Sequence, residues 1–132
     1  MMSKVFRGVA SYQYGYCYIF AIALAHVFDK GITIAWDIEA TDDDLNLIGE
    51  DCLVHAFVTL DNVAALDAGG FNECLESMVE GYPCSALKIE CVSIACMYRI
   101  IKHKGWEMPT DNEIDLLIAY ISENKEQFVK PE

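Results

Sequence analysis

The sequence is short of basic residues. Its 132 residues include 9 lysines and arginines against 21 aspartates and glutamates, which gives a formal net charge of −12. Direct nucleic-acid binding needs a basic footprint on the surface, so this balance argues against it. Seven of the acids lie between Asp37 and Asp51. Two interpretations of them stay open: a solvated acidic face, or a surface that docks on a basic partner.

Several motifs are also missing. The chain has no glycine-rich phosphate loop, no dinucleotide fingerprint and no paired Cys-x-x-Cys unit, so neither a nucleotide cofactor nor a structural zinc is predicted. Cys52-x-x-His55 is only half of a metal site. We therefore expect no metal and no cofactor.

No apolar run is long enough for a membrane span. The longest one, residues 16–29, is too short and too polar at its ends to cross a bilayer, and we expect no membrane association. Lys4 and Arg7 before this run give it a faint resemblance to a signal peptide, but its small residues lie inside the run rather than after it. We expect a cytoplasmic protein.

Six cysteines raise the question of disulfides. Three of them, Cys17, Cys91 and Cys96, lie within apolar runs, where a small thiol packs well. The chain is also longer and less loop-rich than a typical disulfide scaffold, which favours reduced thiols. Its length fits one domain over residues 1–132, without internal repeats or a linker.

The first half of the chain predicts a helix and a hairpin. Residues 4–10 alternate weakly and predict a short edge strand, followed by a turn at residues 11–15. Residues 16–29 are apolar on nearly every side and predict a core helix that ends at Gly31. A strand at residues 32–36 and a short acidic helix at 41–49 follow. Residues 52–60 and 63–66 then predict two strands joined at Asp61-Asn62.

The second half predicts two helices. Apolar residues recur at steps of four and three and favour a helix that ends at Gly105: Leu87, Cys91, Ile94, Tyr98 and Ile101. Thr110-Asp-Asn-Glu113 is a capping box before an amphipathic helix that runs to about residue 128. Residues 71–83 predict a loop or short helix. The predicted fold is α+β, with a helix on a small antiparallel sheet in about residues 1–70 and two helices within about 71–132.

Three separated residues could form a catalytic site. Cys17 lies in the first turn of the core helix, where free N–H groups and the helix dipole favour a thiolate. His55 and Asp67 are nearly equidistant from the predicted turn, so the carboxylate could accept the imidazole Nδ1–H. Gln13 could offer its amide to a developing oxyanion, beside the backbone N–H of Cys17. The alternative is structural: a packed core thiol, an interior histidine and a turn aspartate.

The order of these residues resembles papain-like cysteine hydrolases and transferases. Gly15-Tyr16-Cys17-Tyr18 and residues 20–24 resemble their nucleophile helix, and residues 53–58 and 65–70 resemble their histidine and aspartate strands. The resemblance covers about residues 10–70, and the chain also resembles short phage-encoded proteins. It implies a papain-like core with a Cys-His-Asp triad, which acts through a thioester on a peptide, isopeptide or amide bond of a protein or peptide substrate.

The acidic composition supports a non-enzymatic alternative. On the same fold, the acidic residues would form an interaction module that binds and blocks a host protein. The sequence does not indicate an oligomeric state.

Overall fold

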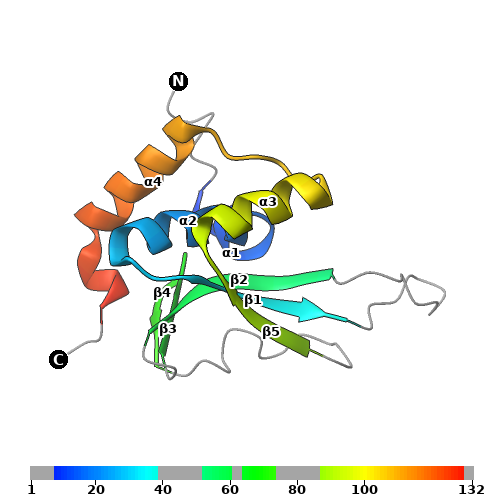
Figure 1. The fold of residues 1–132 in the computed structure, drawn as a ribbon. Coiled ribbons are helices and arrows are strands. Elements are labelled where there is room, and N and C mark those ends of the chain that lie inside the picture. The colour runs from blue at the N-terminus through cyan, green and yellow to red at the C-terminus, as the bar shows by residue number, and fades with distance from the viewer. Residues whose placement is uncertain (1–7, 39–51, 61–63, 74–86, 130–132) are drawn as a thin grey trace.

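The computed structural model describes residues 8–38, 52–60, 64–73 and 87–129. Within these ranges, helices lie along one side of an antiparallel sheet whose strand order is β4-β3-β2-β1-β5 (Figure 1). The α+β fold class is therefore confirmed.

Along the described chain, two helices precede the five strands, and two helices and a 3-10 helix follow them. The strands are β1 (Ile32–Asp37), β2 (Cys52–Leu60), β3 (Ala64–Asp67), β4 (Gly70–Asn72) and β5 (Leu87–Val92). The helices are α1 (Val9–Tyr14), α2 (Cys17–Phe28), α3 (Ile94–Lys104) and α4 (Asp111–Glu123), followed by the short 3-10 helix η3 (Lys125–Phe128).

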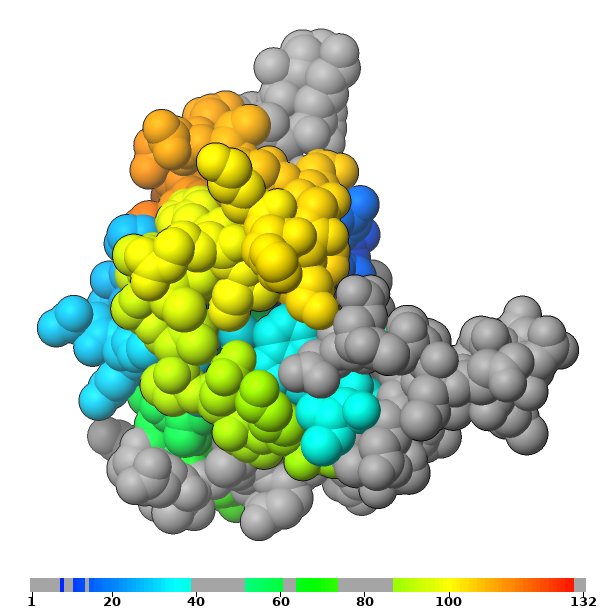
Figure 2. Space-filling model, turned by 45° about the vertical axis from the view of Figure 1, so that its right-hand side comes forward, coloured from blue at the N-terminus to red at the C-terminus, as the bar shows by residue number. Residues whose placement is uncertain are grey.

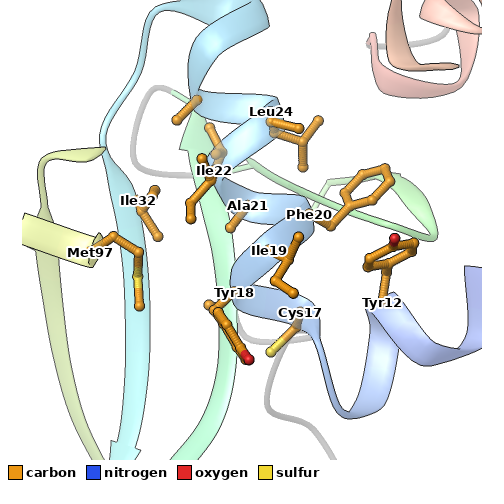
Figure 3. Packing of buried hydrophobic residues seen from close by; sticks show 14 of the residues in the cluster. Tyr12, Cys17, Tyr18, Ile19, Phe20, Ala21, Ile22, Leu24, Ile32 and Met97 are labelled. Atoms are coloured by element: carbon orange, nitrogen blue, oxygen red, sulfur yellow. The ribbon is translucent and has the colours of Figure 1, made fainter. Parts of the chain in front are cut away.

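Helix α2 is the centre of the core. All nine residues from Cys17 to Ala25 are buried, as expected for a helix that is apolar on every side. It packs against both α4 and β2, and Figure 3 shows its buried side chains. The predicted core helix is therefore confirmed.

The end of α2 differs from the prediction. The helix ends at Asp29, which takes the left-handed conformation with φ 53°, and not at Gly31. Gly31 has a different role, because a Cβ there would lie 2.9 Å from Cys91 Sγ and 3.2 Å from the Val92 carbonyl oxygen. A glycine thus lets β5 approach the chain closely at this point.

Strands β2 and β3 pair antiparallel, as predicted. Val58 lies opposite Leu66, and Thr59 lies opposite Ala65. Side chains alternate across β2: Ala56 and Val58 belong to the core around α2, whereas Phe57 packs in a smaller cluster with Ala35 and Ala65.

The start of the described chain is helical rather than extended. The expected strand at residues 4–10 and turn at 11–15 are wrong where the structure describes them, because residues 9–14 form α1. A six-residue helix is too short to be stable on its own and depends on packing. Tyr12 provides this packing, since its ring is buried and its hydroxyl donates to Glu113 Oε2 at 2.7 Å.

The region after residue 71 is not wholly helical. Leu87 and Cys91 belong to strand β5, which pairs with β1 from Ile32↔Val92 to Asp37↔Leu87. Helix α3 begins only after Ser93, whose hydroxyl accepts the Cys96 N–H at 3.0 Å. Pairing with β1 therefore overrides the helical spacing that the sequence shows across residues 87–101.

The two predicted helix boundaries further along are confirmed. Gly105 ends α3 in a left-handed conformation with φ 72°. The Thr110 hydroxyl caps α4 by accepting the Glu113 N–H at 3.0 Å. The buried stripe of α4 then contains Ile114, Leu117 and Ile121.

Other predictions fall outside the described residues. These are the acidic helix at 41–49, the turn at Asp61-Asn62 and most of the segment 71–83; where that segment is described, β4 replaces the expected loop or helix. Within the described ranges, none of the helices has the length and apolar character that crossing a membrane would require.

Candidate active site

Cys17 is the first residue of α2, directly after the Gly15-Tyr16 turn (Figure 3). Tyr16 occupies the N-cap position, and no side chain caps this end of the helix. The Ile19 N–H donates to the Tyr16 carbonyl at 3.0 Å, and the N–H groups and dipole at the start of a helix favour a negative charge nearby. The residue is only 3% exposed, so the thiol lies at the inner edge of the site.

Asp67 holds the imidazole of His55. The distance from His55 Nε2 to Asp67 Oδ2 is 3.0 Å, and the other carboxylate oxygen accepts the Gly69 N–H at 2.8 Å. The His55 ring also stacks on Phe57, with ring centroids 5.7 Å apart. The predicted His55–Asp67 pair is therefore present, but the carboxylate contacts Nε2 rather than the expected Nδ1. This leaves Nδ1 for another partner.

A β-bulge lies directly beside His55. Ala35 pairs with His55, but its neighbour Trp36 pairs with Leu53, so Val54 is an extra residue on β2. Bulges bend a strand locally and redirect the adjacent side chain. This explains how a strand histidine comes to interact with a helix terminus. No local pattern in the sequence predicts the bulge, because it depends on pairing with β1.

His55 interacts electrostatically with both other members of the predicted triad. Burial disfavours its charged form, but hydrogen bonds with Asp67 and with Cys17, and the charges of both groups, more than offset this. Together these effects raise the pKa of His55 from 6.5 to about 9. Because this value lies above neutral pH, the ring is an imidazolium there.

Gln13 lies on the Asp67 side of the imidazole. A Cβ placed on Gly69 would be 2.6 Å from Gln13 Nε2 and 3.1 Å from Asp67 Oδ1. Helix α1 thus brings the Gln13 amide against the turn between β3 and β4. Its role as an oxyanion donor stays a prediction.

Aromatic rings extend from the nucleophile end of α2. The Tyr18 ring lies 5.2 Å from that of Trp106, and its hydroxyl donates to the Glu107 carbonyl at 2.8 Å. Tyr16 lies 6.4 Å from Tyr18. The prediction missed Trp106, because nothing in its local sequence links it to residue 18.

This arrangement contains the residue types that acyl transfer through a cysteine requires. A thiol at a helix N-terminus, an imidazole that interacts with it electrostatically and a carboxylate behind the ring are the groups expected of a nucleophile, a base and an orienting group. Among the described residues, no three histidine, cysteine or acidic side chains form a group suited to a metal ion. Scans against known protein families, curated proteins and solved structures find no match to this chain.

Proposed function

We propose that the protein is a small cysteine hydrolase or acyl transferase that acts on a peptide, isopeptide or amide bond. Cys17 is the nucleophile, His55 the general base and acid, and Asp67 the orienting group. The observation that carries the proposal is the position of the His55 ring, which is hydrogen-bonded to Asp67 at 3.0 Å and lies close enough to Cys17 for that interaction to help raise the pKa of His55.

The first half-reaction forms a thioester. Cys17 gives its proton to His55, the resulting thiolate sulfur attacks the carbonyl carbon of the substrate, and the negative charge moves to the carbonyl oxygen. The backbone N–H groups at the start of α2 favour this oxyanion. The His55 imidazolium then gives its proton to the leaving nitrogen, the C–N bond breaks and the amine departs.

The second half-reaction releases the acyl group. The imidazole, now neutral, takes a proton from water or from an acceptor amine as that molecule attacks the thioester carbon. The C–S bond breaks, and the proton on His55 restores the starting state. Asp67 keeps Nε2 occupied throughout, so Nδ1 is the nitrogen that exchanges protons with Cys17 and the substrate.

The pH dependence of alkylation tests this proposal. Limited access to Cys17 would slow iodoacetamide equally at every pH, so the shape of the profile is informative even for a buried thiol. The exposed Cys91 is the reference thiol in the same sample, and the rates of both cysteines are measured at about pH 6 and about pH 8. Cys17 should change by less than about threefold over this range if it shares its proton with His55. Mass spectrometry of the two peptides gives both rates in one sample.

His55→Gln is the matched variant, because a glutamine amide can still donate to Asp67. In this variant, the alkylation rate of Cys17 should depend on pH in the same way as that of Cys91. The melting temperature reports whether the fold is intact. If Cys17 follows the Cys91 profile in the unmodified protein, the proposed nucleophile is wrong.

A further inference from the structure

A groove with a volume of about 350 Å³ lies between α3 and the sheet, apart from the three proposed catalytic residues. Figure 2 shows this face, where β1 is visible between α3 and β5. The groove is lined by Trp36, Glu90, Cys96, Arg99, Ile100, His103 and Lys104. Its size lies at the small end of the range for ligand pockets, and suits one or two side chains rather than a large cofactor.

Basic side chains line the helical wall. Arg99, His103 and Lys104 face the groove from α3, although the whole chain carries a net charge of −12. Neither Arg99 nor His103 forms an ion pair with another described residue. A protein with a strongly negative net charge thus has a local cluster of basic side chains that can attract an anion.

The sheet side of the groove is largely apolar, and its one carboxylate, that of Glu90, is held by the Trp36 indole. The Trp36 indole donates from Nε1 to Glu90 Oε1 at 2.9 Å, and Lys104 Nζ lies 5.2 Å from the centre of the Trp36 ring. Ile100 and Cys96 add apolar surface on the α3 side. A largely apolar sheet side with a basic rim fits a carboxylate on a short hydrocarbon stem, which is the form of a glutamate or aspartate side chain.

The groove adjoins the proposed catalytic site. Trp36 lies opposite Leu53, two residues before His55 on β2. The Trp106 ring packs on both Trp36, at 5.9 Å, and Tyr18, at 5.2 Å. Because Tyr18 follows Cys17 directly, only one layer of aromatic rings separates the groove from the nucleophile end of α2.

We propose that this groove binds an acidic side chain of the peptide on which the protein acts. Arg99 is the main carboxylate partner, since its guanidinium can bind both oxygens of a carboxylate. That the bound peptide is a substrate rests on the function proposed above, whereas its binding to the groove does not.

Tryptophan fluorescence offers a direct test. Trp36 and Trp106 are the two tryptophans of the sequence, and they lie in and beside the groove. The Cys17→Ala variant is titrated with an acetylated, amidated peptide of four glutamates at an ionic strength of about 50 mM, where charge attraction is weakly screened. We expect saturable quenching or enhancement that weakens as salt is added, and little change with the matching peptide of four glutamines.

Two variants locate the binding. Arg99→Gln should raise the dissociation constant of the glutamate peptide by about tenfold or more, which corresponds to the loss of one charge-assisted hydrogen-bonded pair. Lys102→Gln is the matched control, because it removes the same charge from an exposed position of α3 outside the groove. It should change the constant by less than about twofold.

Three results would overturn the proposal. Equal responses to the glutamate and glutamine peptides would show that charge is not recognised, and equal effects of the two variants would place binding outside the groove. If N-acetylglutamate amide binds as tightly as the tetrapeptide, the ligand is a small acid rather than a peptide. The alkylation profile of Cys17 is measured separately, so failure of the triad and failure of the groove are distinguishable.

Discussion

Replacing Asp67 by asparagine tests what keeps the His55 ring charged. Asp67 uses one carboxylate oxygen for His55 Nε2 at 3.0 Å and the other for the Gly69 N–H at 2.8 Å. The asparagine side chain has almost the same shape as that of aspartate but only one acceptor oxygen. The variant therefore loses the negative charge and leaves one of the two donors unpaired.

The size of the effect follows from the pKa of His55. Its rise from 6.5 to about 9 corresponds to about 3 kcal/mol in favour of the charged ring. Burial acts in the opposite direction, so Asp67 and Cys17 together contribute more than this net value. Without the Asp67 charge, the interaction with Cys17 is the main effect that still raises the pKa of His55, and burial lowers it. We expect the pKa of His55 to fall toward or below its ordinary value, and the imidazole to be largely neutral above neutral pH.

Two measurements follow this change. NMR titration of the His55 ring should show the fall in pKa directly. Alkylation of Cys17 at about pH 7 should slow by about tenfold or more, the effect of losing roughly 1.4 kcal/mol of stabilisation of the ion pair. Asp115→Asn is the control, because it removes the same charge from an exposed position on α4. If His55 still titrates near 9 in Asp67→Asn, or if the control slows alkylation equally, Asp67 is not the orienting group.

Three further predictions concern stability. The pKa of His55 is higher in the folded protein than in the unfolded chain, so its contribution to the free energy of unfolding is complete below about pH 6.5 and is lost as the pH rises through about 9. Urea titrations at several pH values should show this decline, and Asp67→Asn should flatten it. Gly70→Ala should lower the free energy of unfolding by roughly 2–4 kcal/mol, because φ is +107° and the new Cβ would lie 2.7 Å from the Gln127 carbonyl oxygen. A loss under about 0.5 kcal/mol would show that the backbone moves to accommodate the methyl group. Thr110→Ala removes the cap of α4 and should cost about 1 kcal/mol, whereas Thr110→Ser should cost much less.

The strands that carry His55 and Asp67 could be predicted because their signals are local. Alternating side chains and a short polar connection fix an antiparallel register, and a register places residues equidistant from the turn near one another. The 3.0 Å contact between the two side chains confirms this part of the prediction. The catalytic role of the pair stays a prediction.

The orientation of His55 could not be predicted in the same way. The contact with Nε2 and the bulge at Val54 depend on β1, which lies some twenty residues earlier in the chain. A bulge adds one residue to one strand without changing the composition of either. Only the paired strands reveal it.

Strand β5 was misassigned for a related reason. Residues 87–91 do alternate between apolar and polar side chains, which is a strand signal, but the apolar Leu87 and Ile89 are 39% and 52% exposed rather than buried on one face. Its apolar residues Leu87 and Cys91 also fall on the four- and three-residue spacing that continues through α3, and this spacing favoured a helix. The interaction that decides the structure is the ladder with β1, whose residues are far away in the sequence.

This misassigned strand also creates the proposed binding groove. Glu90 reaches the Trp36 indole only because β5 pairs with β1, with Ile34 opposite Glu90 and Trp36 opposite Lys88. The same strand β1 pairs on its other side with β2 beside His55. A helix over residues 87–92 would have left Trp36 without this partner and α3 without a facing wall. The interval between Cys17 and His55 leaves little room for a separate substrate-binding subdomain. If the groove binds peptide as proposed, β5 and α3 supply a peptide-binding surface, and β1 fixes its position relative to the nucleophile.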